Sequence, residues 1–157
     1  MADEQTPAPQ FAIQKVYVKD MSFETPNSPS IFTLKWEPEI NLHLNSKSEM
    51  VQKGIYEVVI SVTITAKIGD KTAYLAEANQ AGIFTITGFE DEQFKAMLGA
   101  YCPTILYPYA REAISDLVGK GGFPQLVLAP INFDALYQQK ITEVNAAIAK
   151  PPGNTAH

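Results

Sequence analysis

The sequence predicts an α+β fold, in which a four-stranded antiparallel sheet carries helices on one of its faces. Apolar and polar residues alternate through the first half of the chain, which is the pattern of half-buried strands. After Thr87 the pattern changes to helical spacing, with residues that favour helix ends. A run of strands followed by a run of helices is typical of α+β folds.

The 157 residues fit one domain, which at this length buries roughly 70% of the surface of the unfolded chain. We expect this domain to occupy residues 10–150, because no linker or repeat divides them. Residues 1–9 are acidic and proline-rich and are expected to form a disordered tail. Residues 151–157 are expected to form another, because Pro151 and Pro152 cannot continue a helix.

The first predicted strand is Phe11–Glu24. Lys15 and Lys19 interrupt its apolar face, and its acids Asp20 and Glu24 fall on the other face with Ser22. The residues assigned to the apolar face are Phe11, Ile13, Tyr17, Met21 and Phe23.

A long irregular crossing is predicted next, because residues 25–38 contain three prolines. A short strand, Ile40–Leu44, follows the crossing. The third predicted strand, Ile55–Ile68, has the strictest alternation of the chain, and Gly69-Asp70 after it marks a hairpin.

The length of this hairpin loop decides which face of the fourth strand, Thr72–Thr87, is buried. A two-residue loop would place Glu77 on the apolar face beside Val62, whereas a three-residue loop keeps Glu77 outside and turns Tyr74 inward. Because an unpaired buried carboxylate is costly, we predict the three-residue loop. The simplest topology then lays the first strand beside the fourth, which makes the sheet a Greek key.

Three helices complete the prediction. The first begins at the acids Glu90 to Glu92, which favour a helix N-terminus, and is expected to stop between Gly99 and Cys102. The second begins at Pro103 and ends at Gly119. The third has Asn132 as its N-cap.

Composition and motifs point away from several classes of function. The chain has 17 acids against 12 bases, a net charge of −5, which disfavours nucleic acid as a partner. No apolar run approaches the roughly 20 residues that cross a bilayer, so membrane insertion is not expected. We find no catalytic motif, no spacing typical of a metal site and no sign of a cofactor. Cys102 is the single cysteine, which fits a reducing compartment such as the cytoplasm, and we expect it to be a buried packing residue.

Two surfaces remain as candidates for function. The crossing is rich in apolar residues such as Phe32 and Trp36, and these either cover the core or form a groove for extended apolar peptide. The sheet face turned away from the helices gathers acids, and it is either a solvated face or a docking site for a basic partner. The candidates are Ile31, Phe32, Leu34, Trp36, Tyr74, Leu136 and Tyr137 for the groove, and Asp20, Glu24, Glu57 and Glu77 for the acidic face.

Four motifs carry a family resemblance across about residues 11–137. They are YVKDMSFETPNSP (17–29), YLAEANQAGIF (74–84), LGAYCPTILYPYAREAI (98–114) and FPQLVLAPINFDALY (123–137). With these motifs in this order, the chain closely resembles the SecB family of protein-export chaperones.

The resemblance implies an ATP-independent chaperone of the bacterial cytosol rather than an enzyme. It would hold unfolded precursor proteins in grooves and pass them to the SecA motor ATPase for translocation across the inner membrane. It would act as a homotetramer, a dimer of dimers with helices packed between two sheets. The family's SecA-binding residues match Asp20, Glu24, Leu75 and Glu77, and its peptide-binding groove is expected to include Trp36, Tyr74, Leu136 and Tyr137.

Overall fold

The computed structural model describes residues 8–149, with side chains described as far as Ile141. Most of the two expected tails, residues 1–9 and 151–157, lies outside this range, and residues 8 and 9 are exposed and irregular. The elements are β1 (Gln10–Glu24), the 3-10 turn η1 (Ser30–Thr33), β2 (Glu39–Gln52), β3 (Ile55–Ile68), β4 (Lys71–Thr87), α1 (Asp91–Ala96), the π-helical turn η2 (Met97–Tyr101), α2 (Cys102–Lys120) and α3 (Phe133–Ala149).

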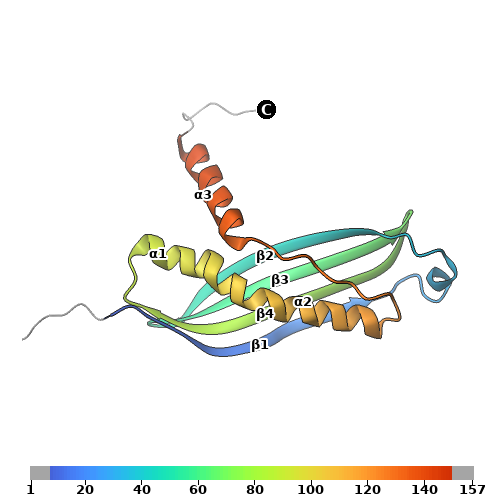
Figure 1. Cartoon of the computed structure of the whole chain (residues 1–157), viewed down its shortest axis with the longest axis horizontal. Coiled ribbons are helices and arrows are strands. Elements are labelled where there is room, and N and C mark those ends of the chain that lie inside the picture. The colour runs from blue at the N-terminus through green and yellow to red at the C-terminus, as the bar shows by residue number, and fades with distance from the viewer. Residues whose placement is uncertain (1–7, 150–157) are drawn as a thin grey trace, which may run out of the picture.

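The four strands form one antiparallel sheet in the order β1-β4-β3-β2 (Figure 1). The predicted α+β class and the predicted neighbourhood of the first and fourth strands are both confirmed. Helix α2 lies along one face of the sheet, whereas α3 projects away from it (Figure 1). We call the face under α2 the helix face and the opposite one the outer face.

The hairpin between β3 and β4 differs from the prediction in its loop but not in its register. Ile68 pairs with Lys71, so the loop has two residues, Gly69 and Asp70, and not three. A register shift next to Ala66 then adds one residue to β4. Because this β-bulge restores the pairing of even with even positions, Glu77 pairs with Thr63 and stays on the outer face.

Two boundaries were predicted wrongly. The strand expected at Ile40–Leu44 extends to Gln52, because pairing with the strongly apolar β3 carries it past the point where its own alternation fades. The first helix does not stop at Gly99–Cys102. The turn η2 bridges that segment, so α1, η2 and α2 follow one another without a break.

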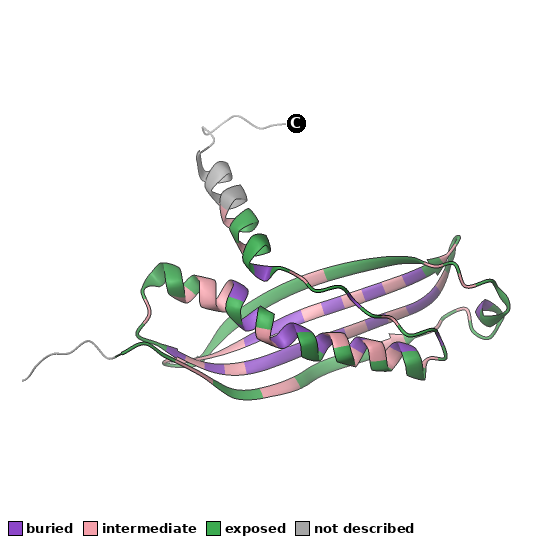
Figure 2. Cartoon of the chain, viewed as in Figure 1, coloured by how far each residue is buried: buried purple, intermediate pink, exposed green. Residues whose placement is uncertain are grey.

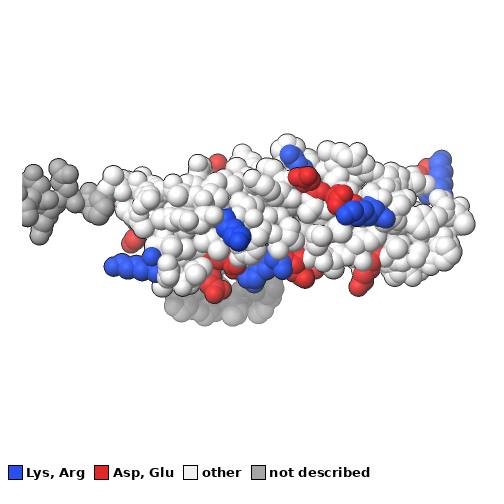
Figure 3. All heavy atoms as spheres, turned by 90° about the horizontal axis from the view of Figure 1, so that it is seen from below, with Lys and Arg blue, Asp and Glu red and all other residues white. Residues whose placement is uncertain are grey.

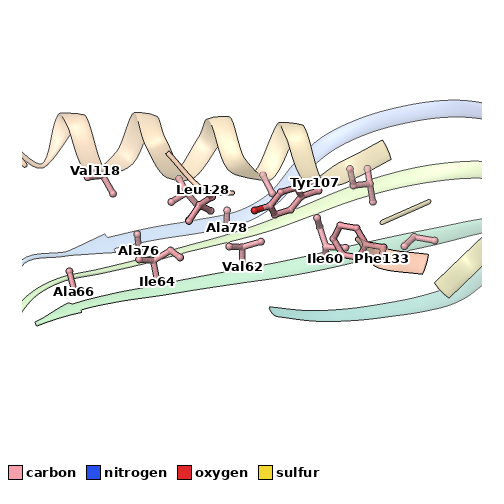
Figure 4. Close-up of a cluster of buried hydrophobic side chains, with 14 of the residues drawn as sticks. Ile60, Val62, Ile64, Ala66, Ala76, Ala78, Tyr107, Val118, Leu128 and Phe133 are labelled. Carbon is pink, nitrogen blue, oxygen red and sulfur yellow. The ribbon is translucent and has the colours of Figure 1, made fainter. Parts of the chain in front are cut away.

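The core lies between the helix face and α2. Buried residues alternate with half-exposed ones along β3 and β4, while the edge strands β1 and β2 are mostly exposed (Figure 2). Ile60, Val62 and Ile64 of β3 meet side chains of α2 and of the segment that follows it (Figure 4). This return segment, residues 121–132, runs back over the sheet and is held by a 2.7 Å hydrogen bond from the Tyr107 hydroxyl to the Ala129 carbonyl.

Candidate functional site

The four residues matched to SecA binding lie together on the outer face. In the register of β1 and β4, Glu24 pairs with Leu75, and Ser22 pairs with Glu77. Asp20 pairs with Asn79, one step further along the same face. We call Asp20, Glu24, Leu75 and Glu77 the acidic patch.

The carboxylates of the acidic patch are not neutralised within the chain. Asp20 and Glu24 are exposed, and Glu77 accepts only a long hydrogen bond, 3.4 Å, from the Thr63 hydroxyl. Among residues 8–141, none of these three acids forms an ion pair. The acidic patch therefore carries uncompensated negative charge. Figure 3 shows acids and bases interspersed along one side of the molecule.

Glu57 shares the outer face but is not part of the acidic patch. Its carboxylate accepts a hydrogen bond from the Tyr17 hydroxyl and lies 2.8 Å from the Lys19 ammonium. These two donors, Lys19 foremost, lower the pKa of Glu57, and burial together with Glu57 raises the pKa of Tyr17 to about 12. The charge of Glu57 is thus satisfied inside the molecule.

The four residues that the family resemblance assigned to the groove form two separate groups. Trp36 and Tyr74 belong to the first, an aromatic cluster at the end of the sheet where the crossing arrives. The ring of Trp36 lies 6.3 Å from that of Tyr74 and 5.4 Å from that of Phe123. Tyr74 is fully buried and forms the floor of the cluster, while Trp36 is half-buried and Phe32 is 50% exposed. Trp36 and Phe32 are therefore the accessible side chains of this cluster.

Leu136 and Tyr137 form the second group, at the start of α3. They line a groove of about 1100 Å³ between α3, the α1–η2 segment and the middle of β2. Leu136 is 44% exposed. The Tyr137 ring packs against Gly99, where an added Cβ would lie 2.6 Å from it. The first turn of α3 is thus held against η2 by contact with a glycine.

Phe123 is the main residue of the aromatic cluster that the sequence analysis did not select. Its ring contacts Phe23, Phe32, Trp36 and Tyr74. It directly follows Gly121-Gly122, just beyond the predicted end of the second helix at Gly119. A large aromatic residue at the start of an apolar irregular segment is the signal that could have identified it.

Cys102 is buried, and this burial raises the pKa of its thiol to about 12. Over the described residues there is no group of three His, Cys, Asp or Glu side chains that could hold a metal ion. Nor does that part of the chain contain a helix with the length and apolar character needed to cross a membrane.

A family model described as "Preprotein translocase subunit SecB" matches residues 4–144. The chain belongs to the SecB family. It is 63% identical over 139 residues to the protein-export protein SecB of Methylococcus capsulatus, with 88% of this chain and 90% of the relative covered. The SecB of Nitrosococcus oceani is 58% identical over 139 residues, with coverages of 87% and 85%.

A solved structure of a SecB-like chaperone from Mycobacterium tuberculosis, in complex with an antitoxin peptide, has the same fold. The TM-score is 0.64 at 20% identity, over 77% of this chain and 90% of the other. Membership of the SecB family makes the chain a protein-export chaperone and not an enzyme.

Proposed function

We propose that this SecB-family chain holds unfolded precursor proteins without nucleotide in the bacterial cytoplasm and delivers them to SecA for translocation across the inner membrane. The observation that carries the proposal is the separation of two surfaces by one sheet. Unneutralised acids lie on the outer face, and partly exposed apolar side chains lie on the helix side. Cargo and motor can therefore be bound at the same time.

The apolar surface suits a ligand that has no fixed shape. Trp36 and Phe32 at one end and Leu136 and Tyr137 at the other offer separated contacts instead of one closed pocket. Because such a surface binds only chains that expose apolar residues, it draws them away from folding by mass action. Several weak contacts on one particle also combine into strong retention. No cofactor is needed for this, and nucleic acid and direct membrane insertion have no place in it.

The proposed particle is a homotetramer, a dimer of dimers, built on a Greek-key sheet. The edge strand β1 exposes Ile13, Val18 and Met21, each about half accessible, beside a groove that separates β1 from α2. Exposed apolar residues on an unpaired edge strand favour association with a second copy of the chain. Native mass measurement should give four chains, and a stable monomer would contradict the proposed assembly.

Capture is tested by refolding a slowly folding precursor in the presence of the protein and without nucleotide. We expect refolding to stop at one tetramer per precursor and to resume when a competing unfolded chain is added. Unchanged refolding at that ratio would rule out the holding function.

Docking is tested with Glu77→Lys, which reverses one charge at the centre of the acidic patch. Affinity for SecA should fall at least tenfold, because a favourable contact becomes a repulsive one. Capture of the precursor should be unchanged, since Glu77 lies on the outer face. Equal loss of both activities would show that the change disturbs folding or assembly instead.

A further inference from the structure

The acidic patch depends on an irregularity in β1. In the middle of this strand, after a first bulge between Ile13 and Lys15, Val16 pairs with Gly82 and Val18 with Gln80, which places even-numbered residues on the helix face. Continued without a break, the same alternation would turn Asp20 and Glu24 toward the helix face and Met21 and Phe23 outward. It does not continue, because Asp20 pairs with Asn79 and leaves Lys19 as an extra residue. This β-bulge reverses the alternation and brings both acids to the outer face.

The bulge at Lys19 is held from the outer face by Glu57. The Tyr17 hydroxyl and the Lys19 ammonium both reach across β4 to the Glu57 carboxylate on β3. Ala81, which pairs with both Tyr17 and Val59, leaves room for this crossing because its side chain is small. The Glu57 carboxylate thus links Lys19, the extra residue of β1, and Tyr17 to the central strand β3.

The same bulge is held from the other side by Gln80. Its side-chain amide donates a 3.0 Å hydrogen bond to the backbone carbonyl of Tyr17. Gln80 is only 2% exposed and is the one polar side chain among the buried residues described. A buried amide needs a hydrogen-bond partner, and Gln80 finds it in a backbone carbonyl two residues before the bulge at Lys19.

We propose that Glu57 is a positioning residue for SecA docking, which fixes the bulge at Lys19 through Tyr17 and Lys19 and so holds Asp20 and Glu24 in the acidic patch. This inference rests on the proposed docking function. Glu57 itself does not touch the partner in this scheme. It acts by preventing β1 from slipping by one residue, which would reverse the face of each residue beyond Val18.

The test compares Glu57→Ala with Glu49→Ala. Glu49 pairs with Glu57 across β2 and β3 and lies on the same face, and among the described residues it makes no hydrogen bond to β1. Both variants lose one negative charge from the outer face, but only Glu57→Ala removes the acceptor of Tyr17 and Lys19.

Three measurements distinguish a positioning role of Glu57 from a direct contact between Glu57 and SecA. Inter-strand contacts between Asp20 and Asn79 and between Ser22 and Glu77, followed by NMR, report the register directly. The ionisation of Tyr17, obtained as the difference from Tyr17→Phe, reports the hydrogen bond to Glu57. Affinity for SecA and capture of a precursor report the two functions.

In Glu57→Ala we expect the inter-strand contacts beyond Val18 to weaken, the pKa of Tyr17 to fall below about 12, and SecA affinity to drop about tenfold, with capture unchanged. Glu49→Ala should change affinity by less than twofold. Should Glu57→Ala fail to fold, Tyr17→Phe removes only one hydroxyl and should loosen the same contacts with a smaller loss of affinity.

Intact register in Glu57→Ala would overturn the proposal, whether SecA affinity is kept or lost, because a loss without a register change means that Glu57 contacts SecA itself. The remaining outcome is that the unaltered protein does not bind SecA, while Glu57→Ala still loses the register of β1. That result would refute the docking function and leave the role of Glu57 in fixing the register standing.

Discussion

Thr63 and Ile64 are neighbours on β3, and they face opposite environments. Ile64 is fully buried beneath α2, whereas Thr63 lies on the outer face and donates its hydroxyl to Glu77. The outer face takes its side chains from the strands themselves, so strand register, including the bulge at Lys19, arranges the acidic patch. On the helix side, the partly exposed residues assigned to the groove come from the crossing and the start of α3, and Phe123 of the return segment packs beneath Trp36 and Phe32. The proposed docking surface is therefore fixed with the sheet, while the proposed cargo surface depends on segments attached to it.

The largest expected effect comes from comparing substitutions on the two faces of β3. Ile64→Ala leaves a cavity in the core and should lower the free energy of unfolding by about 2–5 kcal/mol. Thr63→Ala, one residue away, should cost less than about 1 kcal/mol, because it removes a long hydrogen bond at a half-exposed site. Urea denaturation of both variants measures the difference. Similar losses would mean that the outer face is as tightly packed as the helix face.

The sequence predicted the outer face better than the helix side. Placing Glu77 outside was correct, because the cost of burying a carboxylate outweighs the preference for any one loop. The supporting reason was wrong, since a bulge and not a longer loop restores the register. Tyr17 was assigned to the apolar face but lies on the outer face with Glu57, because two bulges in β1 reverse the alternation twice. Lys15 and Lys19, which interrupt the predicted pattern, mark these bulges to within one residue.

The helix side was harder to predict because its contacts join segments that are far apart in sequence. The stacking of Trp36 on Phe123 depends on how the return segment runs, and no local pattern encodes that path. Tyr137 was grouped with Trp36 first as an apolar candidate for the groove and then by the family resemblance. The structure places Tyr137 against Gly99 instead, in a different groove.

The second prediction concerns the contact between Tyr137 of α3 and Gly99 of η2, on the helix side of the sheet. In Gly99→Ala the added methyl group would lie 2.6 Å from the Tyr137 ring, so the first turn of α3 must move away from η2. We expect precursor to dissociate several-fold faster, because Leu136 and Tyr137 no longer line their groove, while SecA affinity is unchanged.

Gly119→Ala is the matched control for this variant. Gly119 lies near the end of the same helical run, and an added Cβ there meets no atom within 4 Å. It should leave precursor release unchanged. Equal effects of the two substitutions would indicate a general property of the helix and not the contact with Tyr137.

The smallest effect concerns the N-cap of α3. The Asn132 side-chain oxygen accepts a 3.0 Å hydrogen bond from the Ala135 amide, as the sequence predicted for this residue. Asn132→Ala should destabilise the start of α3 by about 1 kcal/mol, and Asn132→Asp should not, because it keeps an acceptor. Hydrogen exchange at the Ala135 amide measures this directly. Faster exchange there, with unchanged exchange in β3 and β4, would show that the groove wall loosens independently of the sheet that carries the acidic patch. Faster exchange in the strands as well would mean that the two surfaces share one cooperative unit.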